Sequence, residues 1–174
     1  MSRENASGGK TSDSGRRAGR LADRIEEGAA GLAAFAEGLT AEEWARPVSK
    51  TDSRTVGVIV DHVANVYPIE VDLARAIASG KDVTDVTWEL VAGVNAKHAG
   101  ERASVTKAAA VERLRKAAHD AAEAVRAFTD EDLDRAARFS LSFGAPMTAQ
   151  FVIEDHPVRH SWHHLAKIRT ALGR

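Results

Sequence analysis

The sequence contains no cysteine among its 174 residues. Disulfide bonds, thiolate metal sites and a cysteine nucleophile are therefore excluded, and a chain without thiols suits a reducing cytoplasm. No apolar run approaches the roughly 18 to 20 residues that a membrane-spanning helix needs. The N-terminal stretch has charges, glycines and serines where a signal peptide would carry its apolar segment. We therefore expect a cytoplasmic protein without a membrane partner.

An excess of charge of either sign is also missing. The chain has 24 basic and 25 acidic side chains, which gives a formal net charge of -1. This balance provides no global basic field that could neutralise a row of phosphates, so we expect no nucleic-acid partner. The length has room for one domain with a substantial core.

Two regions of the chain differ in composition. Residues 1–18 are small, polar and aperiodic, and we expect them to form a disordered tail. In residues 19–174, apolar residues recur at helical spacing between charged ones. No convincing hairpin turn occurs, so no strand pair is expected. The predicted fold class is all-α, an antiparallel four-helix bundle.

Helix boundaries follow from capping residues and from glycine and proline. Thr55 is the expected N-cap of the second helix, with Asp52 and Ser53 as alternatives. Pro68 lies inside that helix and predicts a kink or a one-turn break. Residues 134–146 are predicted to be irregular or extended. The expected helices are 19–38, 55–78, 88–103 continued by a second part that ends at 128, and 148–172.

Four of the seven histidines fall together in the last predicted helix. His156, His160 and His164 are spaced four apart, and His163 directly precedes the last of them. Side chains four apart lie on one side of a helix, so two imidazoles at this spacing can share one metal ion. On a helical wheel, His164 lies inside the apolar arc and His160 at its edge, whereas the other two fall on the polar side. The inward-facing pair is therefore His160 and His164.

Two imidazoles hold a transition metal poorly, so a third ligand is expected. His62 is the best candidate, because it lies in the middle of the second helix close to its valine-rich face. Three nitrogen ligands with open positions for water suit Zn²⁺ or Ni²⁺. A fourth ligand, for which His156 and His163 are the candidates, would instead indicate a closed, structural site. Pro157 is expected to distort the first turn of the last helix.

Other chemically active side chains have plainer interpretations. His98 and His119 have no partner in view, and we interpret them as satisfied or exposed residues. No carboxylate stands out as a general base, and Asp61 and Glu70 are interpreted as surface acids. The catalytic residues are therefore unknown at this stage. The three tryptophans are expected to pack in the core or at the bundle ends: Trp44, Trp88 and Trp162.

Taken in order, four segments make the chain resemble the DinB/YfiT-like superfamily of metal-binding four-helix bundles. Leu39-Thr-Ala-Glu-Glu-Trp44 is similar to the turn after the family's first helix, and Val58-Ile-Val-Asp-His-Val-Ala64 resembles its ligand segment. Trp88-Glu-Leu-Val-Ala-Gly-Val-Asn95 opens the third helix as in an actinobacterial-like branch. The segment from His160 to Arg169 resembles the terminal His-x-x-x-His-Leu-x-x-Ile-Arg of that branch.

The resemblance implies a function as well as a fold. It implies a divalent metal held by His62, His160 and His164 in a site open to solvent, and frequent dimerisation, so that a homodimer is expected. Activities in the superfamily include thiol-S-transferases that use a low-molecular-weight thiol on an electrophilic small molecule, and this is the predicted function. A metal-dependent hydrolase, or a non-catalytic module stabilised by metal, is the alternative. Two departures from the family pattern, at Arg54 and Lys167, change the surroundings of the site but not its ligands.

Overall fold

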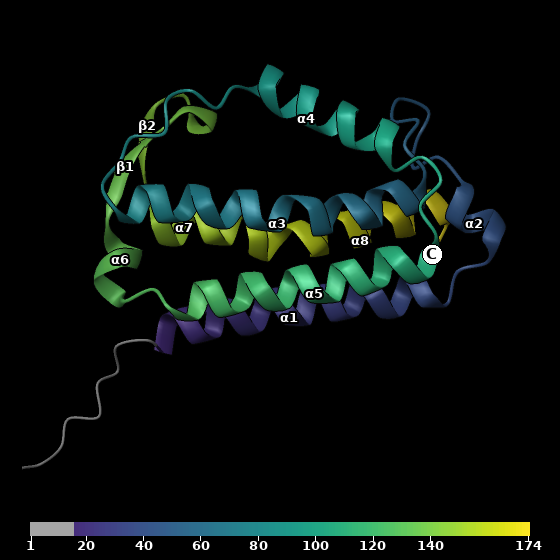
Figure 1. Cartoon of the computed structure of the whole chain (residues 1–174), viewed down its shortest axis with the longest axis horizontal. Coiled ribbons are helices and arrows are strands. Elements are labelled where there is room, and N and C mark those ends of the chain that lie inside the picture. Colours follow the sequence, from purple (N-terminus) through teal and green to yellow (C-terminus); the bar gives the residue numbers. More distant parts are fainter. Residues whose placement is uncertain (1–15) are drawn as a thin grey trace, which may run out of the picture.

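Four long helical stretches form the framework of the molecule (Figure 1). The computed structural model describes residues 16–174. The four stretches bury their apolar faces against one another, which confirms the all-α four-helix bundle. They are α1 (Arg16–Glu37), α3 (Val56–Ala78), α5 (Lys107–Arg126) and a C-terminal run made of α7 (Ala149–Ile153), a π-helical turn (Glu154–Val158) and α8 (Arg159–Leu172).

Shorter elements close the two ends of the bundle and cover one side. The single-turn helices α2 (Ala41–Ala45) and α6 (Asp130–Asp134) lie at opposite ends (Figure 1). Helix α4 (Trp88–Glu101) runs along the outer side of α3, away from α1 and α5. Its one buried residue is His98, so α4 contributes little to the bundle core. None of the helices in residues 16–174 is long and apolar enough to span a membrane.

The first helix begins earlier than the sequence pattern predicted. It starts at Arg16 rather than at residue 19, and Ala18 is fully buried. Arg17 explains the extension, because its guanidinium donates hydrogen bonds to the Asp130 backbone oxygen at 2.8 Å and to the Asp134 carboxylate at 2.8 Å. The prediction of a disordered tail is therefore wrong for residues 16–18. Its remaining part, residues 1–15, lies outside the described residues.

The two helix prolines have different effects. Helix α3 continues through Pro68, so the predicted one-turn break does not occur. The neighbouring side chains Tyr67 and Val71 are buried, and their packing offsets the one hydrogen bond that proline removes. Pro157 lies within the π-helical turn that precedes α8, as expected for a distorted first turn.

The segment after α6 contains a short strand pair that the sequence did not predict. Strands β1 (Ala136–Phe139) and β2 (Ala145–Thr148) pair antiparallel, with Phe139 opposite Ala145. Their connection is a 3₁₀ turn followed by Phe143 at φ 58° and Gly144 at φ 77°. The sequence contains no two-residue Asn-Gly or Asp-Gly turn here, which is the signal that usually reveals a hairpin. The prediction of an irregular or extended segment is therefore correct from residue 135 on, and what it missed is the pairing of the two strands.

The tryptophans do not all pack as predicted. Trp44 lies at the end of the bundle, where its Nε1 donates a hydrogen bond to the Val105 backbone oxygen at 3.1 Å. Trp88 is 61% exposed and Trp162 is 43% exposed. Trp88 remains accessible because α4 stands outside the bundle, so the prediction of core packing is wrong for this residue.

A close approach between Gly57 and Trp44 provides a test of the packing at this end. A Cβ atom on Gly57 would lie 2.5 Å from the indole Nε1, and the indole is held in place by its hydrogen bond to Val105. We expect Gly57→Ala to lower the free energy of unfolding by about 1 to 3 kcal/mol, as other overpacked cores do. Urea denaturation of both proteins measures this difference.

Gly31→Ala is the matched control for this substitution. Gly31 also lies inside a long helix, but its Cβ would meet only Leu165 Cδ2, at an ordinary 3.9 Å. Because alanine favours helix over glycine, we expect Gly31→Ala to raise the free energy of unfolding by about 0.5 to 1 kcal/mol. Equal changes in the two variants would contradict the close approach at Gly57.

Candidate metal centre

Three histidines from two helices meet beside the bundle core. His62 comes from α3, and His160 and His164 come from successive turns of α8. The Nε2 atom of His160 lies 3.2 Å from that of His62 and 3.1 Å from that of His164. Tetrahedral ligation with Zn–N bonds of about 2.0 to 2.1 Å requires nitrogen atoms about 3.3 Å apart. The donor atoms therefore fit a single divalent ion.

The hydrogen bond on the far side of His160 fixes which nitrogen faces the cluster. Its Nδ1 lies 2.7 Å from Glu70 Oε1, and since a carboxylate accepts, Nδ1 carries the proton. The Nε2 of His160 then presents a lone pair to the other two rings. A lone pair directed at two further imidazole nitrogens is the arrangement that a metal ion satisfies.

Burial keeps the remaining two imidazoles in the form that binds metal. His62 is 4% exposed, and burial, reinforced by the neighbouring His160, lowers its pKa to about 3. Burial likewise holds the pKa of His164 far below the usual value, again with His160 as the second cause. Both rings are therefore neutral at pH 7, and a neutral imidazole is the form that ligates a metal.

Glu70 is a buried partner of the cluster, and the prediction of a surface acid is wrong. It is 6% exposed and its second carboxylate oxygen has no hydrogen-bond partner. The residue lies two helical turns after His62 on α3, which places it beside the same ligands of α8. The sequence signal for the burial of Glu70 was a carboxylate among apolar residues, two helical turns after His62.

The carboxylate of Glu70 gives a test of how His160 is oriented. Removal of a group that accepts a hydrogen bond from a metal-binding histidine typically weakens metal affinity by about 10- to 100-fold. We expect Glu70→Ala to weaken zinc binding by this factor, and Glu70→Gln to keep part of the affinity because its amide oxygen can still accept. Competition with a chromogenic chelator measures the affinity.

Asp72→Asn is the control for the loss of a carboxylate from α3. Asp72 is exposed and pairs with Arg75 on the same helix, so its removal should leave zinc affinity unchanged. An affinity of Glu70→Ala equal to that of the unmodified protein would show that Glu70 does not support His160.

A second buried cluster lies beside His62, whose ring is 5.9 Å from that of His98. The carboxylate of Asp61 is completely buried and accepts hydrogen bonds from Arg113 Nη1 at 2.7 and 2.8 Å and from His98 Nε2 at 2.8 Å. Arg102 Nε lies 3.5 Å away. The prediction of a surface acid at Asp61 is wrong, whereas His98 is a satisfied histidine, which is one of the two interpretations that the sequence allowed. These contacts join α4 and α5 to α3 at Asp61, the residue directly before the candidate ligand His62.

The other histidines do not join the three. Among residues 16–174, His62, His160 and His164 form the single group whose side chains could share a metal. His163 is exposed on α8, as predicted, and His119 is exposed beside Glu26. His156 is half-buried rather than polar-facing, with its ring 5.5 Å from the Phe139 ring. The π-helical turn separates it from the regular spacing of α8, so the wheel placed it on the wrong side.

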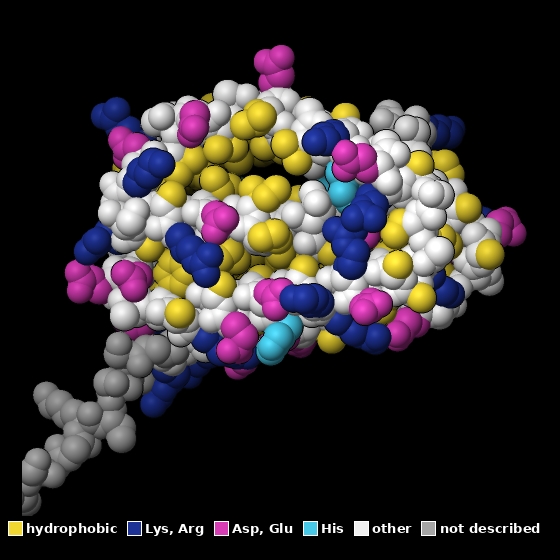
Figure 2. Space-filling view, viewed as in Figure 1, with side chains coloured by type: hydrophobic (Ala, Val, Ile, Leu, Met, Phe, Trp, Pro, Cys, Tyr) yellow, Lys and Arg dark blue, Asp and Glu magenta, His cyan; other side chains and the backbone are white. Residues whose placement is uncertain are grey.

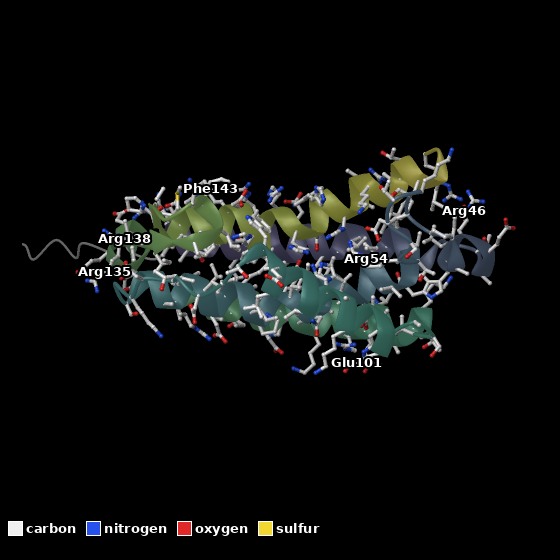
Figure 3. The ribbon with its side chains drawn as sticks, turned by 90° about the horizontal axis from the view of Figure 1, so that it is seen from above. Arg46, Arg54, Glu101, Arg135, Arg138 and Phe143 are labelled. Atoms are coloured by element: carbon white, nitrogen blue, oxygen red, sulfur yellow. The ribbon has the colours of Figure 1, made fainter. Side chains whose placement is uncertain are left out.

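A pocket of about 390 Å³ opens on the histidine cluster. Figure 2 shows hydrophobic side chains around the hollow between α4 and α3. Arg54 lines the same pocket, and Figure 3 shows it near the middle of the molecule, while Arg135 and Arg138 lie at the distant end. The apolar lining consists of Val66, Ile69, Leu73, Val86, Trp88, Leu90, Val91, Val94 and Leu141. The candidate centre therefore has an open, largely apolar space in front of it.

Comparisons with known proteins agree with this architecture. The family model described as DinB superfamily matches residues 24–168. A similar solved structure is YfiT from Bacillus subtilis, described as "a probable metal-dependent hydrolase with an unusual four-helix bundle topology". It is 17% identical, with a TM-score of 0.72, and the match covers 100% of this chain and 93% of that chain. At this identity the likeness establishes the fold. No curated protein matches the chain.

Proposed function

Because the chain belongs to the DinB superfamily, we propose that it is a divalent-metal-dependent enzyme whose ion is held by His62, His160 and His164. The observation that carries the proposal is the convergence of three Nε2 atoms at the end of an apolar pocket. Zinc and nickel suit three imidazole ligands best. A fourth protein ligand would favour a structural role instead, and neither His156 nor His163 is part of the cluster. The geometry therefore supports catalysis over a metal-stabilised binding module.

The reaction that we propose is transfer of a low-molecular-weight thiol to an electrophilic small molecule. A bound divalent ion with neutral ligands supplies a Lewis acid that lowers the pKa of a coordinated thiol or water toward neutrality. The three imidazoles would hold the ion, and Glu70 would orient His160 through its contact with Nδ1. The apolar walls of the pocket hold the acceptor and exclude bulk water from the reacting atoms. The new bond joins sulfur to carbon, the leaving group departs with its electron pair, and the thiol proton passes to solvent.

Hydrolysis is the second candidate for the same site. YfiT is described as a probable metal-dependent hydrolase, and a water molecule can replace the thiol as nucleophile without any change in the ligands. The two reactions differ in one requirement, because only transfer consumes a thiol.

Activity assays with and without thiol separate these candidates. The protein is purified without a histidine tag, loaded with zinc or nickel, and supplied with mycothiol, bacillithiol or glutathione together with a chloro-dinitrobenzene acceptor. We expect turnover that requires both metal and thiol and that disappears in His164→Ala. Cleavage of nitrophenyl esters without thiol would establish the hydrolase instead. Absence of both activities from the fully metal-loaded protein would contradict an enzymatic role.

A further inference from the structure

Helix α3 carries a second apolar stripe, at the edge of the bundle core. Val66, Ile69 and Leu73 recur at intervals of three and four residues and line the pocket. Ile69 is 45% exposed, although a large aliphatic side chain is normally covered in an ordered helix. At Ile69 the stripe therefore faces open space, whereas Val66 is buried and Leu73 packs against the edge of the core.

The facing side of α4 is apolar as well. Leu90, Val91 and Val94 line the same pocket, and Leu90 is 52% exposed. Helix α4 buries only His98, which is fixed to Asp61, so its apolar residues are held in front of α3 without closing onto it. Figure 2 shows the resulting hollow with hydrophobic side chains on both sides.

The charged side chains of the pocket are already paired. Arg54 donates hydrogen bonds to Asp52 at 2.9 and 2.8 Å, and Arg159 Nε lies 3.1 Å from Asp155 Oδ1. Glu70 pairs with His160. With these charges compensated locally, the uncovered apolar area is the main binding feature that the pocket offers to a ligand.

We propose that the acceptor substrate is a mainly apolar small molecule that lies between α3 and α4 with its reactive end at the histidine cluster. That this ligand is a substrate rests on the proposed function. That the pocket binds an apolar ligand does not depend on it. A cavity of about 390 Å³ lies at the small end of the roughly 300 to 1,000 Å³ typical of ligand pockets. The cavity is therefore of the size that holds a small molecule.

Calorimetric titration with 1-hexanol, 1-heptanol and 1-octanol tests the groove directly. Complete burial of one methylene contributes about a fourfold increase in affinity. We expect affinity to rise by about two- to fourfold with each added carbon, in the metal-free and the zinc-loaded protein alike. Affinities that do not change with chain length would overturn the inference even if thiol transfer is observed. Rising affinities without any turnover would sustain the apolar site and count against the proposed reaction alone.

Val94→Asp places a charge in the groove, and Ala96→Asp places the same charge on the exposed side of the same helix. We expect Val94→Asp to weaken 1-octanol binding by at least about tenfold, since burying a carboxylate in an apolar site is strongly unfavourable. Ala96→Asp should bind as the unmodified protein does. Equal binding in both variants would place the ligand elsewhere. A shift of sedimentation coefficient in Val94→Asp, with 1-octanol binding unchanged, would identify the groove as an interface between two copies of the chain.

Discussion

His160→Ala and His164→Ala are each expected to lose most of the bound metal. Each substitution leaves two nitrogens where three now converge, since the Nε2 atoms of His62 and His164 lie 3.2 and 3.1 Å from that of His160. Transition metals are held poorly by two ligands. The loss of affinity should exceed the roughly 10- to 100-fold that follows removal of an outer partner such as Glu70. Metal content per chain, measured on protein purified without a histidine tag, records the effect.

His163→Ala and His119→Ala are the controls for removing an imidazole. His163 is the neighbour of a proposed ligand but is exposed, and His119 is exposed on α5. Both variants should keep their metal, and circular dichroism should show that all four variants are folded. Loss of metal in His163→Ala with retention in His164→Ala would show that the wrong neighbour has been assigned and that α8 is rotated.

Arg113→Met is expected to lower the free energy of unfolding by about 3 kcal/mol. The substitution keeps the bulk of the side chain but leaves the buried carboxylate of Asp61 without the two hydrogen bonds from Arg113. Removing one partner of a buried ion pair typically costs about 3 to 5 kcal/mol. The lower value applies because His98 and Arg102 remain near the carboxylate. Guanidinium denaturation followed by circular dichroism measures the change.

Arg115→Met on the same helix is the matched control. Arg115 pairs with Glu37 at the surface, where both side chains are about half exposed, and such pairs contribute about 0 to 1 kcal/mol. We also expect the double variant Asp61→Leu, Arg113→Met to cost less than the sum of the two single changes, because no charge is then left buried. Equal losses in Arg113→Met and Arg115→Met would mean that the Asp61 cluster does not stabilise the fold.

The sequence was informative where function depends on local spacing. His160 and His164 are one helical turn apart, so their common side follows from helix geometry alone. His62 was selected because an imidazole close to an apolar helix face needs a partner, and the structure brings it to the other two. The bundle itself was predictable for the same reason, since its helices carry regular apolar stripes.

Features that depend on long-range partners could not be predicted. Asp61 and His98 are 37 residues apart and lie on different helices, so no local pattern showed that they pair. Glu70 meets His160 from another helix, and the apolar residues around it in the sequence could indicate its burial but not its partner. Helix α4 carries apolar residues without the regular apolar face of the bundle helices, and it stands outside the bundle with only His98 buried. The pocket follows from that displacement. It could be recognised only from the three-dimensional arrangement.

X-ray absorption spectroscopy of the zinc-loaded protein tests the central claim most directly. The account predicts one zinc per chain with three imidazole nitrogens at about 2.0 to 2.1 Å and at least one further oxygen that does not come from the protein. That oxygen would lie on the side of the pocket that His62, His160 and His164 line. Four protein ligands around the zinc, or no stoichiometric zinc at all in the folded protein, would contradict it.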